Sequence, residues 1–270
     1  MKAMVFAAGL GTRLRPLTDT IPKALVPLGG GTLLSNTLLK LKDSGFNDVV
    51  VNTFHFADKI GSYLRDNDGF GMRISISDER GVLDPSAPLE TGGGILHARR
   101  FLEGGPFLVH NVDIISNLDS PSFVSAASAG TRLATILVSE RKTSRYLLFD
   151  KEMRLAGWKN VSTGEVKSPS PELDLRGLRC LAFSGIHFIS NDIFDVMDDM
   201  EASPEKYPLY DGEGRIVAAG TPGRRFSIID FYLRAAALHE VRGVTVPGLE
   251  LIDVGKPETL ALAREYQNPT

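Results

Sequence analysis

Through its first half, the chain alternates short apolar runs, rich in β-branched residues, with longer amphipathic stretches. This alternation is typical of βαβ units, so it predicts an α/β fold with a Rossmann-like, mainly parallel central sheet flanked by helices. The apolar runs place strands at residues 3–7, 49–53, 73–77, 107–110 and 134–138. Apolar residues at helical spacing predict helices at residues 33–44, 57–66 and 94–101.

The pattern changes after Arg141. The segments YLLFD, LAGWKN and CLAFSGIHFI indicate antiparallel strands, so we expect a small antiparallel β portion in the second half. Helical patterns return at residues 192–200, 228–239 and 257–266, and residues 159–177 are the least structured segment. Because no internal repeat or linker composition separates parts of the chain, we expect a single domain over residues 1–270.

Composition narrows the possible partners and the compartment. A chain of 270 residues that is 43% hydrophobic can bury a substantial core. Its net charge of -3, with no basic block, gives no general attraction to nucleic acid or to an acidic membrane surface. The single cysteine, Cys180, excludes an intramolecular disulfide, and its apolar surroundings predict a buried thiol. No leader or long apolar span stands out, so the expected location is cytoplasmic.

The loop AAGLGTRLRPLT follows the first predicted strand. Its glycines let backbone N–H groups approach a ligand without a Cβ atom in the way, which predicts an anion-binding concavity. A dinucleotide-binding loop needs a third glycine where this chain has Leu14, and no Gly-Lys-Ser/Thr follows to complete a Walker motif. Two cations, Arg13 and Lys23, flank the loop and are candidates to bind one triphosphate.

The ordered pattern from Gly-x-Gly-Thr-Arg to Pro22-Lys23 resembles the signature of the sugar-phosphate nucleotidyltransferases, the nucleotide-sugar pyrophosphorylases. PLETGGGI and FSGI extend the resemblance over almost the whole chain, and PLETGGGI is especially similar in bacterial enzymes that uridylylate N-acetylmuramate 1-phosphate. The resemblance implies an enzyme of nucleotide-sugar biosynthesis, serving the cell wall if that sugar is the substrate. Its substrates would be a nucleoside triphosphate and a sugar 1-phosphate.

The resemblance also assigns residues. Residues 1–140 become mainly the nucleotide-binding half and residues 141–270 mainly the sugar-binding half. The nucleotide-binding residues implied are Ala7, Ala8, Gly9, Gly11, Thr12, Arg13, Lys23, Glu79, Thr91 and Gly92. The sugar-binding residues implied are Gly94, Asn111, Ser184 and Gly185.

Asp113 and Asp253 each end a predicted strand, in FLVHNVD and LIDVG. Strand-end aspartates often cap loops or helices, but Mg²⁺ needs only one or two protein carboxylates beside phosphate oxygens. The resemblance gives both aspartates a role in binding Mg²⁺. Val112 and Lys256 depart from the family's more usual residues beside these aspartates.

No Ser-His-Asp or Cys-His arrangement emerges, so no covalent intermediate is suggested. We expect a sugar-phosphate oxygen to attack the α-phosphorus in line while pyrophosphate leaves. Arg13 would hold the pyrophosphate, and Lys23 the α-phosphate and the sugar phosphate. The resemblance implies that the triphosphate is UTP or GTP. Uridylyl transfer to N-acetylmuramate 1-phosphate is favoured over guanylyl transfer to mannose 1-phosphate. A silent nucleotide-sugar-binding regulator is the alternative outside the enzymes, and a homo-oligomer is possible.

Overall fold

The computed structural model describes residues 1–267, so residues 268–270 of the expected domain lie outside the described part. The chain forms two compact units from discontinuous segments. Unit 1 contains Met1–Pro88, His97–Val124 and Gly248–Thr270, and unit 2 contains Leu89–Leu96 and Ser125–Pro247. The last segment of the sequence therefore belongs with the first, and the expectation of one domain with two halves stays a prediction.

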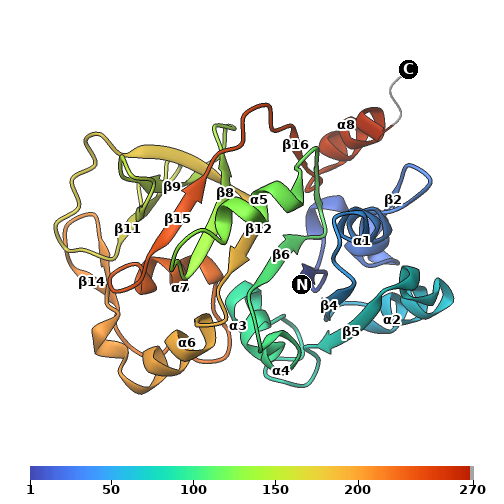
Figure 1. The fold of residues 1–270 in the computed structure, drawn as a ribbon, viewed down its shortest axis with the longest axis horizontal. Helices are drawn as coiled ribbons and strands as arrows, with labels where there is room; N and C mark the ends of the chain where they lie inside the picture. The colour runs from blue at the N-terminus through green and yellow to red at the C-terminus, as the bar shows by residue number, and fades with distance from the viewer. Residues whose placement is uncertain (268–270) are drawn as a thin grey trace. The chain divides into compact units, whose positions relative to one another are not determined.

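Unit 1 is built on a parallel sheet with strand order β6-β1-β4-β5 (Figure 1). These strands are β1 (Lys2–Phe6), β4 (Asp48–Thr53), β5 (Arg73–Asp78) and β6 (Phe107–Asn111). Ala3 pairs with Val49 on one side and with Leu108 on the other, and all three are fully buried. Burial on both faces of the sheet explains why these strands are continuous apolar runs in the sequence.

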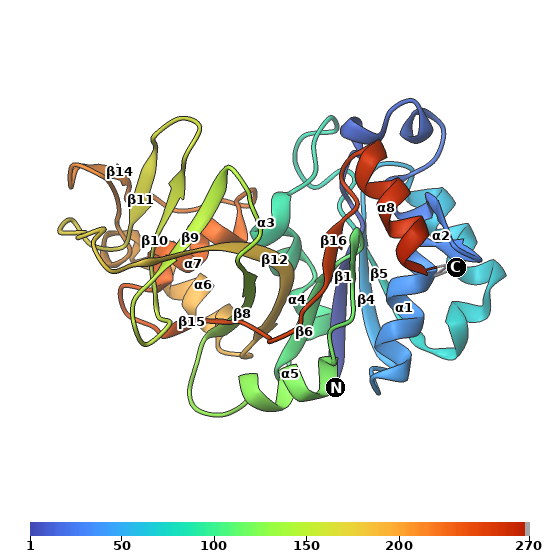
Figure 2. The same ribbon diagram turned by 90° about the horizontal axis from the view of Figure 1, so that it is seen from above.

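Helices cover both faces of this sheet (Figure 2). The crossover helices α1 (Leu33–Asp43) and α2 (Ala57–Asp66) lie on one face, and α4 (Arg99–Leu102) lies on the other. Thr32 begins α1 in a capping box: its hydroxyl accepts from the Ser35 N–H, and the Ser35 hydroxyl accepts from the Thr32 N–H. Unit 1 also contains α8 (Pro257–Gln267) and the short strands β2 (Pro27–Leu28), β3 (Gly31–Thr32), β7 (Ile114–Ser116) and β16 (Leu251–Asp253). Its 3-10 helices are η1 (Thr12–Leu14), η2 (Leu17–Asp19), η3 (Lys23–Leu25) and η4 (Asp68–Gly71).

Unit 2 is mainly antiparallel, with strand order β14-β13-β11-β10-β9-β12 and with β8 beside β12. The helix α7 packs against β10 and β11. Its strands are β8 (Ala134–Ser139), β9 (Arg145–Phe149), β10 (Leu155–Asn160), β11 (Val166–Ser168), β12 (Arg179–Ile189), β13 (Leu209–Asp211), β14 (Ile216–Ala218) and β15 (Val241–Val244). Its helices are α6 (Ile193–Ala202), α7 (Ile228–Ala235) and the 3-10 helix η5 (Pro204–Lys206), and the unit boundaries cross α3 (Glu90–His97) and α5 (Ser120–Ala127).

The predicted α/β class, with its helix-flanked parallel sheet and its antiparallel portion, is confirmed. The helix expected at residues 94–101 is two helices, α3 and α4, which are separated at Ala98. Cys180 is exposed, which corrects the expected buried thiol. It lies at the start of β12 opposite Leu148, where the apolar run has not yet entered the core.

Candidate active site

Lys23 and Asp113 meet in unit 1. Lys23 begins a short 3-10 helix after extended Pro22, and Asp113 follows β6. The Lys23 ammonium donates to Asp113 Oδ2, and the two side chains are only 11% and 19% exposed. The structure therefore brings a predicted phosphate-binding cation against a predicted metal-binding carboxylate.

Asp253 lies beside Asp113 because β7 and β16 pair antiparallel. Asp253 is opposite Ile114, and the Val254 N–H donates to the Asp113 carbonyl oxygen at 2.8 Å. Two aspartates that are 140 positions apart in the sequence thus occupy neighbouring backbone positions. Within residues 1–267, no group of three or more His, Cys, Asp or Glu side chains forms a candidate metal site.

Arg13 approaches the same place. A Cβ atom added to buried Gly255 would lie 2.9 Å from Arg13 Nη2 and 3.1 Å from Asp253 Oδ1. The exposed Arg13 side chain therefore reaches a position that only glycine leaves open. Arg13, Lys23, Asp113 and Asp253 all gather beside the glycine loop of unit 1.

The loop after β1 is anchored at its start by a residue that the sequence motifs do not indicate. Asn52, near the end of β4, accepts the N–H groups of Ala7 and Ala8 through Oδ1 at 2.7 and 3.3 Å. Gly11 adopts φ +66°, and its carbonyl oxygen accepts from the Thr18 hydroxyl at 2.8 Å. In the described chain, no protein acceptor is hydrogen-bonded to the N–H groups of Gly9, Leu10 or Gly11.

Glu79, predicted to contact the base, is only 2% exposed. Its Oε1 accepts from Asn52 Nδ2 at 2.7 Å. Asn52 is equally buried, and no functional motif includes it, so the sequence gives no signal for this contact. The base-binding role of Glu79 stays a prediction.

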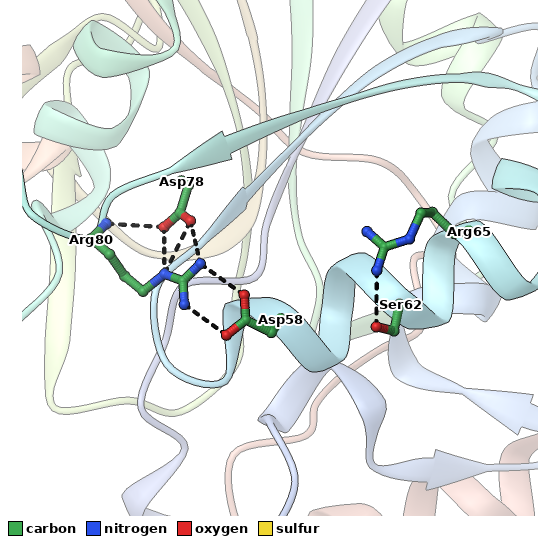
Figure 3. Close-up of polar contacts among 5 residues, drawn as sticks. All are labelled: Asp58, Ser62, Arg65, Asp78 and Arg80. Carbon is green, nitrogen blue, oxygen red and sulfur yellow. Dashed lines mark hydrogen bonds and ion pairs between the residues drawn. The ribbon is translucent and has the colours of Figure 1, made fainter.

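The neighbouring Asp78 is bound by Arg80 (Figure 3). Arg80 also donates through Nη1 and Nη2 to both carboxylate oxygens of Asp58 on α2, at 2.9 and 3.0 Å. Hydrogen bonding to Arg80 lowers the pKa of Asp78, so this carboxylate stays ionised at neutral pH. The segment that begins at Arg80 is therefore tied to both β5 and α2. Figure 3 also places the separate Arg65–Ser62 hydrogen bond on α2.

Asn111 and His110 end β6. Asn111 pairs with Phe6, and its carbonyl oxygen is hydrogen-bonded to His110 Nδ1. Burial lowers the pKa of His110 to about 4, which keeps the imidazole neutral. The burial of His110 within the sheet indicates a packing role for this side chain. Val112 is only 4% exposed, whereas Lys256 is exposed.

In unit 2, the glycines of PLETGGGI pack against protein. The Gly92 and Gly93 N–H groups donate to the Phe226 carbonyl oxygen at 2.9 and 3.2 Å. A Cβ atom on Gly93 would lie 2.3 Å from the Arg224 carbonyl oxygen, and Thr91 Oγ1 accepts from the Ile228 N–H. Gly94 is buried too. The nucleotide-binding roles of Thr91 and Gly92 and the sugar-binding role of Gly94 stay predictions.

The FSGI segment lies in β12. Ser184 is buried and donates to the Ser139 hydroxyl at 3.2 Å, and Gly185 has φ +75°. The pairing with β8 shifts register between Phe183 and His187, as at a β-bulge, and glycine allows the left-handed backbone there. The sugar-binding roles of Ser184 and Gly185 stay predictions.

The α/β fold, and the charged residues gathered beside a glycine loop, are those of a nucleotide-dependent transferase. The chain belongs to the nucleotidyl transferase family, whose sequence model matches residues 2–152. It is 32% identical over 262 residues to an N-acetylmuramate alpha-1-phosphate uridylyltransferase of Caulobacter vibrioides, covering 95% of this chain and 92% of that protein.

A second relative with the same name, from Neisseria meningitidis serogroup B, is 41% identical over 129 residues. The match covers 48% of this chain and 54% of that protein, so the chain spans about half the length of this relative. The solved structure of HddC from Yersinia pseudotuberculosis complexed with GMP-PN has a TM-score of 0.68 at 21% identity, over 99% of both chains, which supports the fold. In the described part of the chain, no helix has the length and apolarity required to cross a membrane.

Proposed function

We propose that the protein transfers a uridylyl group from UTP to N-acetylmuramate 1-phosphate, or a closely related sugar 1-phosphate, and releases pyrophosphate in the cytoplasm. The gathering of Arg13, Lys23, Asp113 and Asp253 beside the glycine loop carries the proposal. Similarity over nearly the full length of the Caulobacter uridylyltransferase supports this choice of substrates. The presence of all four charged residues favours an enzyme over a silent regulator.

The bonds exchanged are at the α-phosphorus. An oxygen of the sugar phosphate bonds to it while its bond to the bridging oxygen of the β-phosphate breaks, and pyrophosphate leaves with that electron pair. Lys23 binds the α-phosphate and the sugar phosphate, and Arg13 binds the departing pyrophosphate. Because these side chains hold both reactants in line, the protein needs no nucleophile of its own.

We assign Asp113 and Asp253 as the residues that would hold Mg²⁺, because Mg²⁺ takes carboxylate oxygens and the Val254 N–H bond to the Asp113 carbonyl oxygen brings the two backbones together. When bound there, the ion would supply positive charge to the phosphate oxygens as negative charge develops on them. Lys23 also bonds Asp113, so it would exchange this contact for phosphate when the nucleotide binds.

The contacts near β5 favour uracil over guanine. Guanine presents an exocyclic amine that requires an additional acceptor, and Asp78 is the carboxylate next to Glu79. Arg80 occupies the Asp78 carboxylate through Nε and Nη2. Accepting the guanine amine would therefore compete with this ion pair, which disfavours GTP.

Competition between equal concentrations of UTP and GTP tests the substrate, with N-acetylmuramate 1-phosphate and mannose 1-phosphate both present. Mass spectrometry of the products should find the UDP-linked amino sugar in excess. Preferential formation of GDP-mannose would replace the proposed substrates while retaining nucleotidyl transfer.

A further inference from the structure

Three parallel strands end at the same edge of the unit 1 sheet, and one side chain links them. Ala7 follows β1, Asn52 lies near the end of β4, and Glu79 follows β5. The backbone register places Phe6 opposite Asn52 and Thr53 opposite Asp78, and the Glu79 N–H donates to the Thr53 carbonyl oxygen at 2.9 Å. Asn52 is thus the middle member of a buried row.

We propose that Asn52 is a positioning residue for nucleotide binding, and that Glu79 fixes its orientation. This inference rests on the proposed function, because it assigns a role in binding the triphosphate. Glu79 acts here by holding Asn52, whether or not it also contacts the base.

The orientation of the Asn52 side chain follows from its three hydrogen bonds. A carboxylate oxygen can only accept, so Glu79 Oε1 binds the amide nitrogen of Asn52 at 2.7 Å. Asn52 Oδ1 is then directed at the loop, where it accepts from Ala7 and Ala8 at 2.7 and 3.3 Å. Burial of Asn52 and Glu79 to 2% exposure excludes most competing water.

This anchor divides the loop into two parts. The Ala7 and Ala8 N–H groups are held by protein and are not available to a phosphate. The next N–H groups, on Gly9, Leu10 and Gly11, have no protein acceptor among residues 1–267 and remain available. Asn52 therefore sets where the loop turns away from the sheet and where its available donors begin.

Reversing the polarity of the Asn52–Glu79 contact tests this role. Asn52→Asp keeps the acceptor for Ala7 and Ala8 but sets a carboxylate against Glu79. Adding Glu79→Gln restores a donor, since the glutamine amide can donate to the aspartate, and the double variant retains one carboxylate and one amide. Asn52→Leu removes the acceptor altogether. Thr53→Val is the matched control, because Thr53 is the next, fully buried residue of the same strand.

Steady-state kinetics should separate the two substrates. We expect Asn52→Leu and Asn52→Asp to raise the KM for the triphosphate at least about tenfold, the cost of about one misplaced hydrogen-bonding group, with the KM for the sugar phosphate nearly unchanged. The double variant should return to within about threefold of wild type. Hydrogen exchange at residues 7 and 8 should be faster in both single variants and slow again in the double variant. Thr53→Val should match wild type throughout.

Calorimetric titration of wild type with UTP and with GTP keeps two failures apart. If wild type binds neither nucleotide, the proposed function is wrong. If wild type binds one of them, and Asn52→Leu and Asn52→Asp bind that nucleotide as tightly as wild type does, the positioning role is wrong. The positioning role is also wrong if the single variants lose thermal stability, their KM values rise for both the triphosphate and the sugar phosphate, and the double variant restores neither the stability nor the KM values. Asn52→Asp and Glu79→Gln preserve side-chain shape, so the comparison holds even if Asn52→Leu does not fold.

Discussion

The Lys23 ammonium group donates to the carboxylate of Asp113, 90 positions further along the chain. Neither side chain is more than one-fifth exposed, so the pair is shielded from most of the solvent. It joins the glycine loop to the β7–β16 pair, where Asp253 is held.

Replacement of Lys23 by alanine should remove turnover without unfolding the protein. Loss of the cation that we propose binds the α-phosphate should lower kcat/KM at least about 100-fold, as for other lost charge-stabilising groups. The partly buried Asp113 left behind should cost about 1–3 kcal/mol in the free energy of unfolding. Pyrophosphate release and urea denaturation measure the two effects. Arg13→Ala should also lose activity, whereas Lys151→Ala, at an 87% exposed side chain in unit 2, should not. Wild-type kinetics in folded Lys23→Ala would remove this residue from the reaction.

Removal of divalent metal should stop the reaction, and Mg²⁺ should restore it. Asp113→Asn and Asp253→Asn should each lower activity at least about 100-fold, because the proposed ion would supply several kcal/mol of charge stabilisation. Titration with Mg²⁺ measures the maximal activity of each variant and the Mg²⁺ concentration that it requires. Asp174→Asn is the control, since Asp174 pairs with Arg176 in an exposed loop. Turnover that persists in excess chelator would contradict a metal role for these two aspartates.

A methyl group at Gly255 should impair binding of the triphosphate with little loss of stability. Gly255→Ala places Cβ 2.9 Å from Arg13 Nη2, and the flexible Arg13 side chain can move away at small cost to the fold. The displaced guanidinium should raise the KM for the triphosphate about tenfold, equivalent to one weakened charge-assisted hydrogen bond. Gly30→Ala is matched to it, because no heavy atom lies within 4 Å of a Cβ at Gly30. Equal kinetics for the two variants would show that Arg13 does not depend on this glycine.

In contrast to Gly255→Ala, a methyl group at Gly93 should lower the stability of the fold. Its Cβ would lie 2.3 Å from the Arg224 carbonyl oxygen, and backbone cannot move as freely as a side chain. We expect Gly93→Ala to lower the free energy of unfolding by about 1–3 kcal/mol through overpacking, and Gly220→Ala, in open space, to be nearly neutral. Thermal denaturation compares them. If Gly93→Ala is as stable as wild type, the packing account of PLETGGGI is incorrect.

Local patterns predicted the elements of unit 1 well because each buried strand and each amphipathic helix carries its own periodicity. The strand predicted at residues 49–53 is β4, Asp48–Thr53, and the helix predicted at residues 57–66 is α2, Ala57–Asp66. The predicted helix begins at residue 94, whereas α3 begins at Glu90. Three consecutive glycines have low helix propensity, so the sequence does not indicate this first turn. The glycines are required at positions 92 and 93 because a Cβ atom there would clash with residues 224–226.

The sequence predicted the site residues that belong to a local motif. It could not predict the arrangement that depends on pairing between distant segments. Arg13, Lys23, Asp113 and Asp253 each belong to a recognisable motif. The β7–β16 pairing that sets the two aspartates side by side depends on contacts between distant segments. Asn52 follows three consecutive valines in β4, and its role emerges only when β1 and β5 lie on either side of it.

The most direct test of the central claim is the stoichiometry of products formed from UTP and N-acetylmuramate 1-phosphate by the wild-type protein with Mg²⁺. Phosphorus NMR can follow both substrates and both products in one sample. The account predicts one UDP-linked sugar for each pyrophosphate released, with neither product formed when the sugar phosphate is omitted. Release of inorganic phosphate in place of pyrophosphate, or no reaction with any pairing of UTP or GTP with the two sugar phosphates, would contradict it.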